Sequence, residues 1–386
     1  MDNRMKCLFA FSALTIITCS RRDSGLVETV NGPLNYNEDW GYYQIRPSAY
    51  MFWWLFSVNA TEERPLLLWH TGGPGSSSTG TGNLEGIGPK ALDGSDHPYT
   101  WLQVADLVFV DSPVGTGYSY VTNSSCFTSN VQEVAEDLFN WYSQFFDDYP
   151  HYKKRIFYLF GGSYAGKFVA EFAKILLQRK QKFPVNLKGI GLGSSLVDPS
   201  SLMTYWGAYL HTMSLVDEID LEALNNKISE CKDLITLKRW DTALDCHNEF
   251  RSLAWQLSGF HNPFNVMKTS EPVIINGSCY LSVQEEMVKK FHRNDFMKSA
   301  LSTVDFLLEN GLQVVLHHGQ LDMIVNLPGI EMWINKLQWK HKGHFKTAHR
   351  RLLYGTKNNR ALFYKSFQNL HLYTVLYSGH QVGVTY

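Results

Sequence analysis

Short apolar runs alternate with amphipathic segments along this chain, and this alternation limits the folds open to it. The runs are rich in β-branched and aromatic residues and lie at residues 66–69, 107–110, 156–160, 187–192, 313–316 and 370–376. Between them, apolar residues recur every three or four positions at residues 131–145 and 168–176, which predicts helices with one buried face. Strands that alternate with helices predict an α/β protein with a mostly parallel central sheet and helices on both faces.

The alternation stops in the middle of the chain. Residues 199–296 are polar and helix-like, and they hold three of the six cysteines. We expect one core built from residues 35–198 and 297–386, with residues 199–296 inserted as a helical cap. Because the active sites of open α/β sheets lie beyond the carboxyl ends of the strands, we expect the cap to cover that edge.

The charges of the chain nearly cancel, with 35 Lys and Arg against 36 Asp and Glu for a net charge of −1. Such a chain has no general positive field to collect polyanions or anionic lipid. We therefore expect neither nucleic acid nor a membrane surface as a partner. Aromatic residues make up 14% of the 386 residues, which favours an aromatic-lined pocket.

The N-terminus has the pattern of a secretory signal peptide. Arg4 and Lys6 precede an uninterrupted apolar stretch from Cys7 to Cys19, after which polar residues return. A helix of that length spans about 20 Å, which is short of the roughly 30 Å hydrocarbon core of a membrane. We therefore predict a signal peptide over residues 1–20, a secreted chain and no stable membrane insertion.

Secretion would place the remaining cysteines in an oxidising compartment. Four follow the predicted signal peptide: Cys126, Cys231, Cys246 and Cys279. Two disulfides are expected, although four cysteines allow three pairings and the sequence does not choose among them. Acceptor motifs for glycosylation agree with secretion, and they lie at Asn59, Asn123 and Asn276.

A strand, a sharp turn and a helix are predicted around Ser163. The apolar run of residues 156–160 leads into a Gly-Gly-Ser-Tyr-Ala stretch, and an amphipathic helix follows. A nucleophile on such an elbow needs small residues two positions to either side, and Gly161 and Ala165 meet that requirement. The alternative is an ordinary strand-to-helix turn in which glycine supplies a positive φ.

Two further residues could complete a catalytic triad, because a serine hydroxyl needs a base and an acid that orients the base. Asp322 and His380 each lie on a loop after a predicted strand, and the order Ser, Asp, His is that of the α/β-hydrolase arrangement. Each alone could also be an ordinary loop residue. The backbone N–H groups of Gly73 and Tyr164 could hold the oxyanion, although the glycine cluster could equally be a tight turn.

With these motifs the chain resembles the serine carboxypeptidases across nearly all of its predicted mature length. The resemblance rests on residues 50–54 (YMFWW), 69–75 (WHTGGPG), 87–89 (IGP), 111–120 (DSPVGTGYSY), 163–167 (SYAGK) and 319–322 (GQLD). It implies an α/β-hydrolase fold with a helical cap and a triad of Ser163, Asp322 and His380. It also implies removal of C-terminal residues from peptides or proteins through an acyl-enzyme, in a secreted or lysosomal setting and without a cofactor.

The chain departs from the family where the substrate's terminal carboxylate would bind. In the family a Glu precedes the serine, a second acid precedes the Ile/Leu-Gly-Pro element, and an amide residue precedes the Gly-Gly pair. This chain has Gly162, Gly86 and Thr71 there, with Glu85 one position from the place of the second acid. We expect Thr71, Gly72, Gly162 and Glu85 to line a substrate site that recognises a free C-terminus weakly.

The C-terminal end is a second departure. The family continues after its His with a Met-Val-Pro stretch and a terminal helix, whereas this sequence ends at Tyr386. We therefore expect the residues after His380 to do little to fix the catalytic loop.

Other functions stay open on the sequence alone. A chain with this fold and a weak carboxylate site could be a secreted binding protein, or an esterase or acyltransferase that keeps the triad. His341, His344 and His349 could suggest a metal, but their spacing fits no helix-borne pair of ligands. We expect an exposed loop there and no metal site.

Overall fold

The fold is described from a computed structural model, which covers residues 34–59, 64–259, 262–268, 285–354 and 360–382. The predicted signal peptide, Asn276 and Cys279 lie outside these residues. None of the helices in the covered ranges is both long and apolar enough to cross a bilayer.

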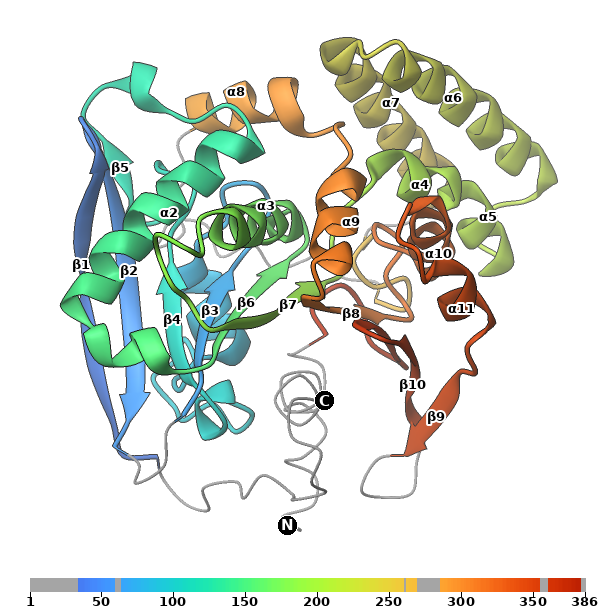
Figure 1. The fold of residues 1–386 in the computed structure, drawn as a ribbon. Helices are drawn as coiled ribbons and strands as arrows, with labels where there is room; N and C mark the ends of the chain where they lie inside the picture. Colours follow the sequence, from blue (N-terminus) through green and yellow to red (C-terminus); the bar gives the residue numbers. More distant parts are fainter. Residues whose placement is uncertain (1–33, 60–63, 260–261, 269–284, 355–359, 383–386) are drawn as a thin grey trace.

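One sheet of eleven strands runs through the described part of the molecule (Figure 1). The strands are β1 (Tyr36–Arg46), β2 (Ala49–Val58), β3 (Leu66–His70), β4 (Asp106–Val110), β5 (Tyr120–Val121), β6 (Phe157–Gly162), β7 (Leu187–Gly193), β8 (Gln313–Gly319), β9 (Arg351–Tyr354), β10 (Arg360–Phe367) and β11 (Leu370–Val375). Their order is β1-β2-β4-β3-β6-β7-β8-β11-β10-β9, and β5 pairs with β2. The six strands from β4 to β11 in this order are parallel, which confirms the predicted mostly parallel sheet.

Helices cover the sheet on both sides, which explains why its central strands are apolar throughout. The α-helices of the first and last parts of the chain are α2 (Val131–Asp148), α3 (Ala165–Gln178), α9 (Leu301–Glu309), α10 (Leu327–Lys336) and α11 (Lys342–Thr347). The other helical segments are η2, a π-helix (Ser78–Ile87), and the 3-10 helices η3 (Trp101–Gln103), η4 (Ser124–Cys126) and η5 (Pro150–Lys154). In β4, Val108 and Val110 pack with α2 and α3, whereas Leu107 and Phe109 pack with η3 on the opposite face.

Both ends of the sheet are antiparallel, and the sequence patterns do not predict this. β1 and β2 form a hairpin at one end, and β10 pairs antiparallel with both β11 and β9 at the other. β1 is mostly exposed and β9 has only four residues. Neither strand therefore carries the buried apolar run by which the central strands can be recognised.

The histidine-rich segment after residue 340 is largely exposed, as expected, but most of it is a helix, so the expectation of a loop there is wrong. The helix is α11, and its surroundings hold it: the rings of His341 and His344 lie 5.7 and 5.0 Å from the ring of Phe367. These contacts reach across to β10 and leave no local signal in the sequence. In the residues that the structure covers, no group of three or more His, Cys, Asp and Glu side chains could hold a metal ion.

Residues 199–296 are here called the middle segment. Its helices are α4 (Pro199–Thr204), α5 (Trp206–Thr212), α6 (Glu218–Thr236), α7 (Trp240–Ser258) and α8 (Glu285–Asp295). Figure 1 shows α6 and α7 side by side at one end of the molecule, next to α4 and α5. These helices share an apolar core that includes Trp206, Leu224 and Phe250 and reaches Met323 beyond the end of β8. The exact limits of core and cap stay a prediction.

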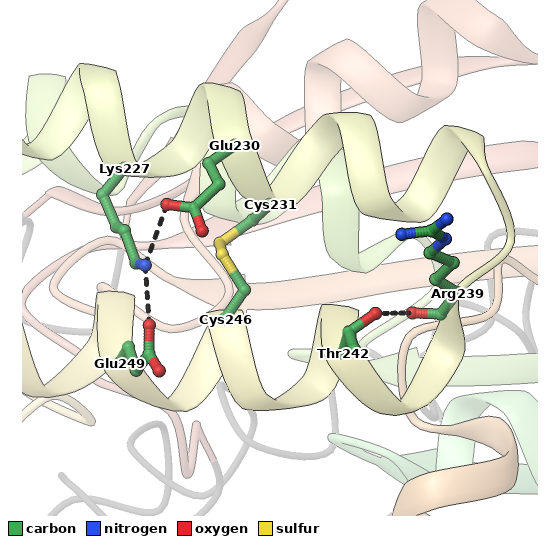
Figure 2. The surroundings of a disulfide bond; sticks show 7 residues. All are labelled: Lys227, Glu230, Cys231, Arg239, Thr242, Cys246 and Glu249. Atoms are coloured by element: carbon green, nitrogen blue, oxygen red, sulfur yellow. Dashed lines mark hydrogen bonds and ion pairs between the residues drawn. A yellow bond between two sulfur atoms is a disulfide. The ribbon is translucent and has the colours of Figure 1, made fainter.

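A disulfide joins α6 to α7. Cys231 and Cys246 are bonded, which selects one of the pairings left open by the sequence, and Cys126 is a free, half-buried thiol. Beside the disulfide, the ammonium group of Lys227 donates to Glu230 at 2.9 Å and to Glu249 at 2.6 Å (Figure 2). The disulfide and this ion-pair cluster thus link the two helices in addition to their shared apolar core.

We predict that removing the disulfide destabilises this helical pair much more than removing the ion pairs. The cysteines are 15 residues apart, and a crosslink that closes such a loop contributes about 3 kcal/mol to the free energy of unfolding. Surface ion pairs contribute about 0–1 kcal/mol. Denaturant unfolding of the C231S/C246S double variant should show the larger loss, with Lys227→Met as the control. Equal losses in the two variants would contradict the prediction.

Candidate active site

The three predicted triad residues lie beyond the carboxyl ends of parallel strands. Ser163 follows β6, Asp322 follows β8 and His380 follows β11. These strands belong to the consecutive series β6-β7-β8-β11. Because parallel strands run in one direction, the loops that carry the three residues leave the sheet from the same edge.

Ser163 lies on a sharp turn between β6 and α3. Its φ is 56°, a left-handed conformation that residues with side chains rarely adopt. The N–H of Ser163 donates to Gly193 O at 2.8 Å, and its carbonyl oxygen accepts the N–H of Leu196 at 3.0 Å. A Cβ on Gly161 would lie 2.7 Å from the carbonyl oxygen of Ala165, so the turn requires glycine there. A strained serine on a tightly packed strand-to-helix turn is the geometry of a nucleophile elbow.

His380 and Asp322 are joined by a short hydrogen bond. Nδ1 of His380 lies 2.7 Å from Oδ2 of Asp322, whose other oxygen accepts the N–H of Val325 at 3.0 Å. The Asp322 side chain is fully buried. Because a carboxylate only accepts hydrogen bonds, this contact puts the imidazole proton on Nδ1 and leaves Nε2 as an acceptor. A histidine oriented in this way can act as a general base.

The loop that carries His380 is fixed from the middle segment. The N–H of His380 donates to Phe264 O at 2.7 Å, and the two rings lie 5.2 Å apart. The N–H of Leu321 donates to Ser378 O at 2.8 Å. A Cβ on Gly379 would lie 2.2 Å from Phe264 O, so the close approach requires glycine. Support for the loop therefore comes in part from Phe264, a residue far earlier in the chain.

The glycine loop after β3 lies against the elbow. A Cβ on Gly72 would lie 2.8 Å from Cβ of Ser163 and 2.7 Å from the backbone nitrogen of Tyr164. Gly73 has a φ of 111°, which glycine adopts without strain. The two expected oxyanion donors, the N–H groups of Gly73 and Tyr164, thus belong to segments that meet beside Ser163. Preorganised donors of this kind stabilise the negative oxygen of a tetrahedral intermediate.

A buried carboxylate after β4 holds the start of the π-helix that follows this glycine loop. Asp111 accepts hydrogen bonds from the hydroxyls of Ser77 (2.9 Å) and Thr79 (2.8 Å) and from the N–H groups of Ser78 (2.8 Å) and Tyr118 (3.0 Å). Burial raises the pKa of Asp111, and these hydrogen bonds oppose the rise. The network fixes the chain shortly after the glycine loop, without itself touching the elbow.

The residue after Ser163 is tied to the end of α8. The hydroxyl of Tyr164 donates to Oδ1 of Asp295 at 2.7 Å. One helical turn further on, the buried ammonium group of Lys167 donates to the carbonyl oxygens of Phe296 (3.0 Å) and Lys298 (2.6 Å). Burial lowers the pKa of Lys167 to about 8. These contacts join the middle segment to the elbow across 131 positions of sequence.

Two of the residues expected at the substrate's C-terminus, Gly162 and Thr71, lie beside Trp69. A Cβ on Gly162 would have only the Trp69 ring within 4 Å, at 3.7 Å, so a side chain could be added there. Thr71 Oγ1 accepts a hydrogen bond from the Trp69 indole at 3.1 Å and keeps its own hydrogen to donate. Glu85 lies on η2, where burial raises the pKa of its carboxyl group. In the described residues no hydrogen bond joins Glu85 to Thr71 or Gly162.

Sequence reasoning misses three residues that support this site. Asp111 could have been suspected, because a carboxylate directly after a fully buried strand needs several partners. Phe264 and Asp295 give no such signal, since each acts on a residue more than a hundred positions away. Of the predicted glycosylation acceptors, Asn59 and Asn123 are exposed.

Comparison with known proteins identifies the relatives of this chain. The family model for serine carboxypeptidases matches residues 29–280 and 266–385. The human retinoid-inducible serine carboxypeptidase is 32% identical, over 89% of this chain and 88% of the relative. The Arabidopsis thaliana serine carboxypeptidase-like 51 is 29% identical, over 96% of this chain and 93% of the relative.

A solved structure supports the fold. A prohormone-processing carboxypeptidase from Saccharomyces cerevisiae superposes with a TM-score of 0.80 at 21% identity, over 93% of this chain and 90% of that one. At this level of identity the likeness bears on the architecture only. It agrees with the α/β-hydrolase fold expected from the elbow and the order of the strands.

Proposed function

The chain belongs to the serine carboxypeptidase family, and from this we propose that it removes C-terminal residues from peptides or proteins through a Ser163, His380 and Asp322 triad. The observation that carries the proposal is the 2.7 Å hydrogen bond between His380 and Asp322, on the sheet edge that also carries the strained serine. The proposed reaction needs no cofactor.

The proposed mechanism begins with proton transfer from the Ser163 hydroxyl to Nε2 of His380. Oγ forms a bond to the carbonyl carbon of the last peptide bond, and the carbonyl oxygen becomes an oxyanion held by the N–H groups of Gly73 and Tyr164. His380 then gives the proton to the leaving amine as the C–N bond breaks, which leaves an acyl group on Ser163. Water, deprotonated by His380, hydrolyses this ester and restores the serine.

We also propose that the middle segment acts as the cap of this site and that the chain functions outside the cytosol, in a secreted or lysosomal setting. Phe264 of the middle segment touches the His380 ring, and the hydroxyl of Tyr209 donates to Gln320 O at 2.8 Å beside Asp322. The disulfide between α6 and α7 favours an oxidising compartment. Exposed Asn59 and Asn123 are available as glycosylation acceptors there.

The activity test is the release of the last residue from an N-blocked dipeptide with a free carboxylate. We expect the wild-type chain to release it and the His380→Ala variant to lose the release, because no base would then activate Ser163. An undiminished rate in a folded His380→Ala variant would contradict the proposal.

With glycine at position 162, the chain lacks an acid that could recognise a free carboxylate, so we expect it to accept esters and amides as well as free acids. An acid placed at this position should restore a preference for free-acid substrates. A protonated glutamic acid at this position could donate to the substrate's terminal carboxylate, and a hydrogen bond to a charged group contributes about 1.5–3 kcal/mol, or tenfold or more. We predict that Gly162→Glu raises the kcat/KM ratio of free-acid over amide substrates by about tenfold near pH 4, below the usual pKa of a glutamic acid. The gain should fade as the pH rises, because an ionised glutamate repels a carboxylate.

The control for this prediction is Gly162→Ala, which adds a Cβ in the same open space without an acid. Its ratio should stay at the wild-type value. If the glutamate and alanine variants gave the same ratio at every pH, position 162 would not lie at the substrate's carboxylate.

A further inference from the structure

Four nitrogen-bearing side chains gather between α7 and α8. His247, Arg251 and Trp255 are spaced four residues apart on α7, so they share one face of the helix. His292 of α8 completes the group. The guanidinium group of Arg251 lies 4.9 Å from the centre of the Trp255 ring. We call these four residues the basic cluster.

Phe296 joins the two helices of the basic cluster and also touches the proposed active site. Its ring lies 5.3 Å from the ring of His247 and 5.0 Å from that of His292. The Phe296 ring also stacks on the ring of Tyr164, with the two ring centroids 5.5 Å apart and the ring planes at 18° to each other. The basic cluster is therefore one aromatic ring away from the residue that follows the nucleophile.

One nitrogen of each member lacks a partner. Among the residues that the structure describes, Nδ1 of His247, Nε of Arg251, Nε1 of Trp255 and Nε2 of His292 are buried atoms that find no hydrogen-bond partner. In the part of the chain that the structure covers, no carboxylate pairs with Arg251. Buried donors without acceptors are costly, and native proteins rarely leave several of them together. Nε of Arg251 and Nε1 of Trp255 can only donate hydrogen bonds, and an anion would supply the acceptor that these two groups lack.

The electrostatics of the basic cluster also favour an anion there. Burial and the charge of Arg251 lower the pKa of His247 to about 4, and the same two causes lower the pKa of His292. Burial also lowers the pKa of Arg251. Two acids of these helices are engaged elsewhere, since Glu249 pairs with Lys227, and Asp295 with Tyr164. Each neutral imidazole still has one N–H to donate, and Arg251 remains positively charged.

We propose that His247, Arg251, Trp255 and His292 form a subsite that binds a carboxylate of the peptide substrate, an inference that rests on the proposed function. The planar guanidinium group offers paired N–H donors that match the two oxygens of a carboxylate. Arg251 and His292 are only half-buried, so a substrate can reach them. The carboxylate is either the terminal one, for which the chain lacks the family's Glu before Ser163, or that of an Asp or Glu side chain.

Binding to the inactive full-length Ser163→Ala protein tests the subsite without turnover. Three N-acetylated tripeptides of equal length serve as probes in calorimetric titrations: one with Glu and a C-terminal amide, one with Gln and an amide, and one with Gln and a free carboxylate. The added variants are Arg251→Met and, as a matched control, Arg293→Met, which removes the same charge from an exposed position on α8.

We expect Arg251→Met to weaken binding of a carboxylate probe by about 10- to 100-fold and to leave the Gln amide probe unchanged. If Arg251→Met weakens binding of the Glu amide probe, the subsite binds an acidic side chain. If it weakens binding of the free-acid probe, the subsite binds the terminal carboxylate. Arg293→Met should leave the affinity for both carboxylate probes unchanged. If Arg251→Met does not fold, Arg251→Lys is used instead, because lysine keeps the charge and lacks the paired donors. We then expect a smaller loss of affinity for the same probe.

Equal affinities of the parent and a folded Arg251 variant for all three probes would overturn the proposal, as would a parent that does not prefer either carboxylate probe to the Gln amide. Hydrolysis by the wild-type chain is measured separately. A subsite that binds carboxylates in a chain that hydrolyses nothing would refute the proposed function alone, and hydrolysis without carboxylate preference would refute the subsite alone.

Discussion

The Ser163→Ala variant is expected to lose about a million-fold in kcat on a blocked dipeptide, while its free energy of unfolding stays nearly the same. The loss is large because every covalent step of the proposed mechanism passes through Oγ of this residue. Stability is expected to change little, because alanine keeps the Cβ, so the backbone at φ 56° is strained to the same extent in both proteins. Steady-state kinetics with a sensitive assay for the released residue would measure the effect.

A matched control is Ser252→Ala, which removes a hydroxyl from an exposed position on α7. Its kcat should equal that of the wild-type chain. If Ser163→Ala kept a tenth or more of the wild-type rate while remaining folded, another residue would be the nucleophile and the elbow would be a structural turn.

The Asp322→Asn variant is expected to lose about ten-thousand-fold in kcat with little change in structure. Asparagine has nearly the same shape, and its oxygen can still accept the N–H of Val325. Its amide N–H₂, however, donates where the carboxylate accepts, which forces the proton of His380 from Nδ1 to Nε2. The imidazole then has no lone pair to offer Ser163.

The comparison of Asp322→Asn with Asp111→Asn makes this result specific. Asp111 is also buried and satisfied by several hydrogen bonds, but none of them reaches His380. Its replacement should lower stability more than Asp322→Asn and kcat far less. A kcat for Asp322→Asn within tenfold of wild type would show that Asp322 does not orient the base.

The elbow and the parallel strands could be predicted from the sequence because their causes are local. Buried strands between two helical layers need apolar runs, and these runs are continuous in the sequence. The turn at Ser163 needs a residue without a Cβ at position 161, because a Cβ there would lie only 2.7 Å from the carbonyl oxygen of Ala165. Constraints of this kind leave a signature within a few residues of the feature they produce.

The support of the site could not be predicted, because it depends on contacts between distant segments. The bond from Tyr164 to Asp295 and the contact of Phe264 with His380 both join the middle segment to the core. No local spacing specifies either of them. The pairing of Cys231 with Cys246 likewise depended on α6 and α7 lying side by side, which four cysteines alone do not reveal.

The most direct test of the catalytic proposal is labelling of the purified full-length protein with a fluorophosphonate, followed by mass spectrometry of the labelled peptide. The reagent phosphonylates an activated serine and assumes no substrate. We predict a single adduct on Ser163, at wild-type level in Ser252→Ala and absent in Ser163→Ala. A folded wild-type protein that takes no label, or that carries the label on another residue, would contradict the account.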